Sequence, residues 1–92
     1  MATVKVTVDL DEIDLRKVDE DDSSTWVRGR HVDNLQGLLT ATRRPAYDPK
    51  GIDGIAGPDT KKAVGRLQDE QDIDDDKRFV VGRETWEKLI EF

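Results

Sequence analysis

Hydrophobic and polar residues alternate along the start of this chain, with an apolar side chain at every second position from residue 4 to residue 10. These apolar residues are Val4, Val6, Val8 and Leu10. A period of two with β-branched residues predicts a half-buried β-strand over residues 3–10. Ile13 and Leu15 continue the alternation, so we expect a second strand and a hairpin with a wide loop. An isolated hairpin is barely stable in water, so these strands should pack on the rest of the protein or on a partner.

A polar, acidic stretch over residues 19–25 follows, and we interpret it as a solvated linker. From residue 30 onward the spacing of the apolar residues becomes helical in three places. The expected inner faces are Val32, Leu35, Leu38 and Leu39, then Thr60, Ala63, Val64 and Leu67, then Thr85, Trp86, Leu89 and Ile90. The pattern predicts a β segment and linker over residues 1–25 and a mainly α domain of three helices over residues 26–92.

Proline and glycine mark the ends of the predicted helices. Pro45 ends the first helix, because proline disfavours a helical residue before it. Gly57 and Pro58 begin the second helix, and Gly82 begins the third. Gly37 lies inside the first helix, where glycine costs about 1 kcal/mol relative to alanine. We therefore expect another element to pass close to Gly37.

Two segments of the chain repeat one pattern. A shift of 25 residues lays Gly57 on Gly82 and Thr60 on Thr85, and an apolar helix position follows in each copy. Each copy is typical of a glycine-bearing turn that begins a short amphipathic helix. A repeated turn-and-helix unit is a strong constraint on the fold.

The ordered set of these residues resembles the peptidoglycan-binding-like domain found beside many bacterial cell-wall hydrolases. The matching positions are Val32, Leu35, Gln36, Leu39, Asp53, Gly54, Gly57, Thr60, Ala63, Val64, Gln68, Val81, Gly82, Thr85, Trp86 and Leu89. They cover about residues 29–90. The resemblance implies a three-helix module that binds the wall without catalysis, since the catalytic domain in this family is a separate one.

The chain departs from the family pattern at a few positions. Ala56 stands where the family usually has phenylalanine, and Leu67 stands where it usually has an aromatic residue. We expect Phe79 to refill the volume that Ala56 gives up. The alternating segment at the N-terminus is not part of the family pattern.

Length and charge narrow the classes of partner. A chain of 92 residues makes one small domain. Its net charge of −6 disfavours nucleic acid and anionic membrane surfaces, and no stretch reaches the roughly 18 apolar residues of a membrane span. The N-terminus lacks a basic start followed by an apolar run, so we expect no secretory signal. Cytoplasmic synthesis, with release by lysis or inside a phage particle, is the expected route to a wall.

The sequence does not predict an enzyme. It has no cysteine and one histidine, His31, which we expect in an exposed first turn. Ser23 and Ser24 lie in the acidic linker, without the strand-to-helix turn of a serine nucleophile. We expect no catalytic residue, no cofactor and no metal.

An acidic turn, with Asp72, Asp74 and Asp76, is similar to the opening of a calcium loop. The sixth position of such a loop should be glycine and is Lys77, and the twelfth should be glutamate and is Arg83. A solvated turn is the better interpretation.

The best candidates for ligand binding are Arg43, Arg44 and Tyr47, with the turn at Asp53 and Gly54 near them in sequence. Peptidoglycan stem peptides end in carboxylates, which arginine can bind through two hydrogen bonds. A tyrosine ring can lie against a sugar or a peptide. The alternative is that both arginines only neutralise the carboxyl end of a helix.

Four further residues have structural interpretations. Trp86 shares a helix face with Leu89, so we expect it in the core rather than as a platform for sugars. Trp26 fits a core-capping or an exposed position equally well. Gln36 and Gln68 take matching places, and we expect them to hydrogen-bond the turns and satisfy buried backbone groups.

Two hypotheses for the function remain. The first is a non-catalytic module that binds the glycan or the stem peptide of peptidoglycan. The second is a structural or assembly protein, in a phage particle or an injection machine, that contacts a protein partner through residues 3–18. The resemblance favours the first.

Overall fold

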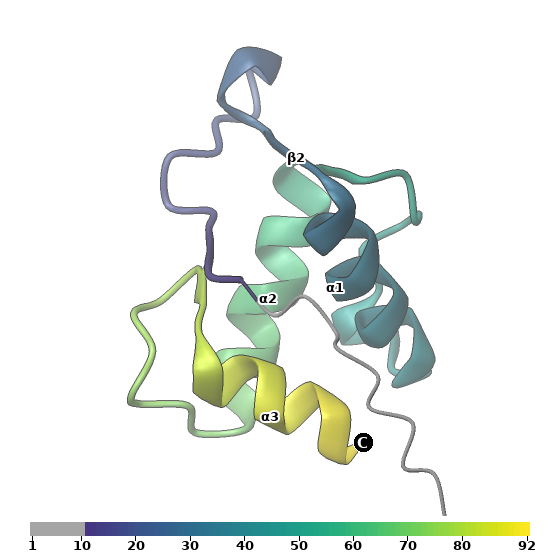
Figure 1. Cartoon of the computed structure of the whole chain (residues 1–92), viewed down its shortest axis with the longest axis vertical. Helices are drawn as coiled ribbons and strands as arrows, with labels where there is room; N and C mark the ends of the chain where they lie inside the picture. The colour runs from purple at the N-terminus through teal and green to yellow at the C-terminus, as the bar shows by residue number, and fades with distance from the viewer. Residues whose placement is uncertain (1–10) are drawn as a thin grey trace, which may run out of the picture.

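A computed structural model of the protein describes residues 11–92, so the strand predicted over residues 3–10 lies outside the described part. Three α-helices carry the fold of the described residues (Figure 1): α1 (Arg30–Ala41), α2 (Pro58–Glu70) and α3 (Arg83–Glu91). The prediction of three helices is confirmed.

Short strands and turns connect the helices of the described chain. The strand β1 (Ile13–Asp14) pairs antiparallel with β4 (Val80–Val81), and β2 (Val27–Arg28) pairs antiparallel with β3 (Ile55–Ala56). Two 3₁₀ turns are η1 (Ser23–Thr25) and η2 (Pro45–Tyr47). Residues 11–92 therefore form a small mixed domain of three helices and two short sheets.

The helices α2 and α3 begin at the predicted glycines. Gly57 is the N-cap of α2, Pro58 is its first residue and Asp59 lies in its first turn, where a negative charge suits the helix dipole. Gly82 is the N-cap of α3. At the start of α1, Gly29 has a φ of 147°, which residues with a side chain rarely adopt.

The predicted inner faces are buried, with two corrections: Leu38 is half-buried, and Ile90 is exposed. Ile90 is 56% exposed, although Trp86 and Leu89 of the same helix are 1% and 2% exposed. The position of Ile90 explains the difference, because it lies about 100° around the helix from Leu89 and in the last turn of α3.

The expectation for Gly37 is also wrong. A Cβ atom built at Gly37 meets no atom within 4 Å, so no element passes close to it. This glycine faces open space on α1 and has no packing reason to be there.

The segment before Trp26 shares the core of the helical part. Ile13, Leu15 and Val18 belong to the same buried cluster as the helix stripes. The Leu15 amide donates to the Phe79 carbonyl at 2.9 Å, and the strand partner of Ile13 is Val81. The residues that follow the predicted hairpin loop therefore pack on the helical part of the protein, as expected.

Lysine and tryptophan side chains also attach this segment to the helices. The ammonium group of Lys61 donates to the carbonyls of Arg16 and Val18 at 3.2 and 3.1 Å. The indole nitrogen of Trp86 donates to the Asp11 carbonyl at 3.2 Å. The described residues before η1 thus contact α2 and α3 directly.

Gln36, which is 1% exposed, connects α1 to the turn before α2. Its amide nitrogen lies 3.1 Å from each of the Ile55 carbonyl, the Thr60 hydroxyl and the Asp53 carboxylate. Its carbonyl accepts from the backbone amides of Asp53 and Gly54, both at 3.0 Å. One buried side chain therefore satisfies several backbone groups that the turn leaves unpaired.

Gln68 connects α2 to the turn before α3 in the same way. Its amide nitrogen donates to the Val80 carbonyl at 2.9 Å and to the Thr85 hydroxyl at 3.2 Å. Its carbonyl accepts from the Phe79 amide at 2.8 Å. The prediction that Gln36 and Gln68 hydrogen-bond the turns is confirmed.

The turn before α3 has an additional cap. One carboxylate oxygen of Asp76 accepts from the Thr85 amide and hydroxyl, at 2.7 and 2.6 Å, and from the Gly82 amide at 3.2 Å. Asp76 thus satisfies free amides at the start of a helix, which is the usual work of a carboxylate at that place.

Gln36→Leu tests the importance of the buried amide. The change keeps the volume but leaves two amides and a carbonyl, all partly buried, without this partner, and each such group costs about 1–3 kcal/mol. We expect urea unfolding to show a loss of about 3 kcal/mol or more in the free energy of unfolding. Gln71→Leu is the matched control, because it removes one hydrogen bond, to the Tyr47 hydroxyl. Equal losses in the two variants would contradict this account.

Gly37→Ala should stabilise the protein. An added methyl group meets nothing, and alanine favours a helix by about 1 kcal/mol over glycine. We therefore expect the free energy of unfolding to rise by about 1 kcal/mol in the same urea experiment. A decrease would mean that another part of the protein packs against this position.

Candidate functional site

The loop after α1 forms the candidate site. The helix ends at Ala41, and the chain then turns through Arg43, which has a φ of 59°. Pro45 begins η2 and fixes the next part of the loop. The loop thus places two consecutive arginines just beyond the carboxyl end of α1.

A shallow pocket of about 230 Å³ lies at this place. It is lined by Leu39, Thr40, Arg43, Arg44, Pro45 and Asp48. The two arginines predicted as ligand residues therefore share one pocket. Asp48 adds a negative charge to it that the sequence did not single out.

The charges in this pocket are not paired with one another. Four ion pairs lie within 4.0 Å among residues 11–92, and none of them includes Arg43, Arg44 or Asp48. The alternative expectation, that both arginines only neutralise the carboxyl end of α1, is consistent with their place just beyond that end.

Tyr47 lies beneath this loop and is fully buried. Its hydroxyl donates to the Glu70 carboxylate and accepts from the Gln71 amide nitrogen at 3.2 Å. The buried ring offers no face on which a sugar or a peptide could lie. In this structure Tyr47 therefore supports the pocket from inside instead of stacking on a ligand.

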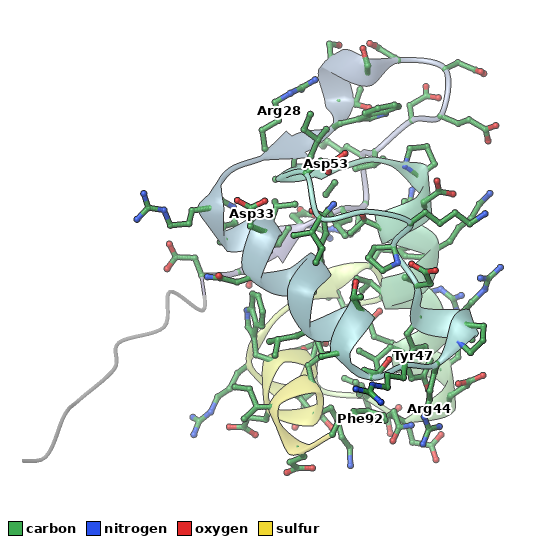
Figure 2. The ribbon with its side chains drawn as sticks, turned by 90° about the vertical axis from the view of Figure 1, so that its right-hand side faces the viewer. Arg28, Asp33, Arg44, Tyr47, Asp53 and Phe92 are labelled. Carbon is green, nitrogen blue, oxygen red and sulfur yellow. The ribbon has the colours of Figure 1, made fainter. Side chains whose placement is uncertain are left out.

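An aromatic pair holds the guanidinium group of Arg44. The guanidinium carbon lies 4.9 Å from the ring centre of Phe92 and 5.8 Å from that of Tyr47. The two rings meet edge to face, 5.9 Å apart with an angle of 83°. Figure 2 shows Arg44, Tyr47 and Phe92 gathered at one end of the molecule. Stacking of this kind fixes the guanidinium plane and leaves its N–H groups available to an anion.

Phe92 is the residue that sequence reasoning missed. It is 47% exposed and lies outside the expected inner face of the third helix. An aromatic residue that no predicted core accounts for was the available signal, but its partner could be found only from the three-dimensional arrangement.

The turn at Asp53 and Gly54 does not join this pocket. Figure 2 shows Asp53 near Arg28 and Asp33, away from Arg44 and Tyr47. The five predicted ligand residues therefore fall into two groups, which the structure does not bring together.

The chemistry of the Asp53 turn is that of a structural turn. One carboxylate oxygen of Asp53 accepts from the Ile55 amide at 3.0 Å and from Gln36, and these hydrogen bonds lower the pKa of Asp53. Gly54 has a φ of 73°, and a Cβ there would lie 2.9 Å from a carboxylate oxygen of Asp33. Glycine is required here by the backbone, whether or not a ligand binds.

Trp86 and Trp26 both support the fold. Trp86 is 1% exposed, so its core assignment is confirmed. Trp26 is half-buried against the core, and its indole nitrogen donates to the Asp19 carbonyl at 2.8 Å. A Cβ at Gly57 would come within 3.1 Å of the Trp26 ring. The core-capping interpretation of Trp26 is the one that the structure bears out.

Phe79 packs against α2. A Cβ at Gly65 would lie 2.5 Å from the Phe79 ring, so the ring occupies the space that this glycine leaves. The positive charges of Lys61 and Arg78 lie 5.0 and 4.9 Å from the ring centre. Phe79 thus packs over Gly65. That Phe79 refills the volume that Ala56 gives up stays a prediction.

His31 and the acidic side chains of residues 11–92 were the remaining candidates for a site. His31 lies in the first turn of α1 as expected, but the expectation that it is exposed is wrong, because it is half-buried with its ring turned back toward Gly29. Within the described part of the chain, no group of three or more histidine or acidic side chains is placed to hold a metal ion. No helix between residues 11 and 92 has the length and apolar character needed to cross a bilayer.

Comparison with known proteins found no match to this chain among family models, among curated proteins or among solved structures.

The pKa of Tyr47 gives a test of the buried ring. Burial of the hydroxyl, with the Glu70 carboxylate beside it, raises the pKa of Tyr47 above its usual value. The folded protein therefore disfavours tyrosinate. The contribution of Tyr47 to the free energy of unfolding should be fully present below about pH 10, the pKa of an unfolded tyrosine, and should be lost as the pH rises above that value. The chain has one tyrosine, so ultraviolet absorbance of tyrosinate reports this residue alone.

Thermal melting at a series of alkaline pH values measures the effect, with Tyr47→Phe as the control that lacks this titration. A Tyr47 that ionises like free tyrosine in the folded protein would show that the ring is accessible.

Proposed function

We propose that this protein is a non-catalytic module that binds bacterial peptidoglycan, with the three-helix, repeat-containing fold of the peptidoglycan-binding-like domain. The arrangement of the two turn-and-helix units supports the proposed fold. Gln36 and Gln68 make equivalent contacts, and the shift that relates Thr60 to Thr85 also relates Ile55 to Val80.

One observation carries the proposed function: two unpaired arginines line one open pocket in a protein whose net charge is −6. The pocket carries two positive charges and one negative charge, and carboxylates are ligands that arginine binds well. Stem peptides of the wall carry carboxylates on their free ends. We infer that Arg43 and Arg44 bind such an end, and that the turn at Asp53 and Gly54 serves the fold.

The alternative is an assembly protein that meets a protein partner through its N-terminal strand. It is favoured by the alternation of residues 3–10, which precede β1 in the sequence. In the described chain, β1 pairs with one strand, β4. We place this alternative second because the pocket has no role in it.

Co-sedimentation with purified cell-wall sacculi tests the proposal. We expect the full chain to be retained in a saturable way, and Arg44→Ala and Arg43→Ala each to weaken retention by about tenfold, the value of one charged hydrogen bond. Arg66→Ala is the matched control, because Arg66 is exposed on α2 and lines none of the pockets at the end of α1. Its retention should equal that of the unchanged protein.

Circular dichroism melting should accompany each variant, so that loss of binding is separated from loss of folding. Retention that is unaffected by both pocket variants would remove the pocket from the site. Absence of retention on walls of several chemistries would overturn the proposed function and favour the assembly alternative.

A further inference from the structure

The second turn-and-helix unit shows what the start of its helix binds. One carboxylate oxygen of Asp76 accepts from the Gly82 amide, the Thr85 amide and the Thr85 hydroxyl, at 3.2, 2.7 and 2.6 Å. The shift of 25 residues that relates the two units places Gly51 where Asp76 stands, and glycine has no side chain. Within the described chain, the first unit therefore has no counterpart of this carboxylate.

The equivalent donors at the start of α2 have no acceptor within residues 11–92. They are the amides of Gly57 and Thr60 and the hydroxyl hydrogen of Thr60. Thr60 is 2% exposed, and its hydroxyl oxygen accepts from the Gln36 amide nitrogen at 3.1 Å, so the hydroxyl hydrogen must point elsewhere. Its side chain lines a pocket of about 170 Å³ at this end of α2. Buried donors are nearly always bonded, so this one points to a ligand.

The same pocket contains an acceptor that the turn does not use. Asp53 lies beside Thr60, because both side chains bond the same nitrogen of Gln36 at 3.1 Å. One carboxylate oxygen of Asp53 serves the turn, since it accepts from Gln36 and from the Ile55 amide. The other oxygen makes no hydrogen bond to any described residue, and Asp53 lines the pocket. Donors and an acceptor are therefore available together.

An aromatic ring lies next to these groups. The Trp26 ring packs on Gly57, where a Cβ would lie 3.1 to 3.3 Å from three of its atoms. The hydrogen bond from its indole nitrogen to the Asp19 carbonyl fixes the ring. Trp26 is half-buried and lines the same pocket. A fixed tryptophan offers an apolar surface to the C–H groups of a sugar ring.

We propose that this pocket binds the acetamido group of an N-acetylated amino sugar. Its carbonyl accepts from the Thr60 amide and hydroxyl, its N–H donates to the second oxygen of Asp53, and the sugar ring lies against Trp26. The inference rests on the proposed function for its source, the glycan strand of the wall, and adds a contact away from the arginine pocket (Figure 2). A carboxylate fits less well, because Asp53 and Asp59 outnumber Lys50 in the lining.

Two trisaccharides isolate the acetamido group. Triacetylchitotriose carries it on each ring, and cellotriose has the same linkages with a hydroxyl in its place. Titration of the isotope-labelled full chain by nuclear magnetic resonance should show triacetylchitotriose shifting the backbone amides of residues 53–60 and not those of residues 40–48. We expect cellotriose to bind at least about tenfold more weakly, because it lacks the hydrogen bonds of the acetamido group.

Asp53→Asn is the decisive variant. Asparagine keeps an oxygen for the Ile55 amide, so the turn should remain in place, but it puts a donor where the acetamido N–H needs an acceptor. We expect this variant to bind triacetylchitotriose about tenfold more weakly. Asp48→Asn is the matched control, because it removes the same charge from the pocket at the end of α1. Its affinity should equal that of the unchanged protein, and circular dichroism melting checks the folding of both variants.

Equal binding of the two trisaccharides to the unchanged protein, shifts that map elsewhere, or no shifts up to the solubility limit would overturn the inference. N-acetyl-D-alanine methylamide supplies amide groups without a sugar ring. If it binds at the same residues as tightly as triacetylchitotriose, the site recognises a peptide and the sugar assignment is wrong.

The sacculus experiment keeps this inference separate from the proposed function. Retention on walls that depends on Arg44, without binding of triacetylchitotriose, would refute the sugar site and leave wall binding intact. Binding of triacetylchitotriose by a protein that no sacculus retains would refute wall binding and leave the sugar site in place.

Discussion

The fold depends on two buried carboxamides. A turn that precedes a helix leaves backbone amides and carbonyls unpaired, and burying them without partners would cost more than a small core can supply. Gln36 and Gln68 satisfy these groups from the preceding helix, so each turn is held against the helix before it. The loop that carries the pocket has its own anchor of the same kind, because the buried hydroxyl of Tyr47 is bound to α2.

Much of the fold could be predicted from the sequence, because periodicity and glycine or proline at helix starts are local signals. They located α1, α2 and α3 and placed Trp86 in the core. Ile90 was misplaced because the end of a helix can extend past the core, which no local pattern reveals. Gly37 was misinterpreted for a similar reason, since a glycine in a sequence looks the same beside a neighbour and beside solvent.

The candidate site was harder to predict than the fold. Arg43 and Arg44 were correctly grouped, because they are neighbours in sequence. Asp53 and Gly54 lie apart from them, because the loop between the two pairs runs to the other end of α1. Tyr47 was assigned to a ligand, since a tyrosine in a loop is usually exposed, whereas burial and the hydrogen bond to Glu70 make it a support. Phe92 could not be assigned at all, because its partner Arg44 is distant in sequence and the contact exists only after α3 packs.

The contacts of the two glutamines also run in one order along the chain. α1 holds the turn of the unit that follows it, and α2 holds the turn of the next, so the units form a series in which each depends on the one before. α3 has no glutamine and therefore offers no side chain of this kind to a further turn. In the terms of repeat proteins, α3 is therefore held by the contacts of the unit before it, as each member of an array is held by its neighbour.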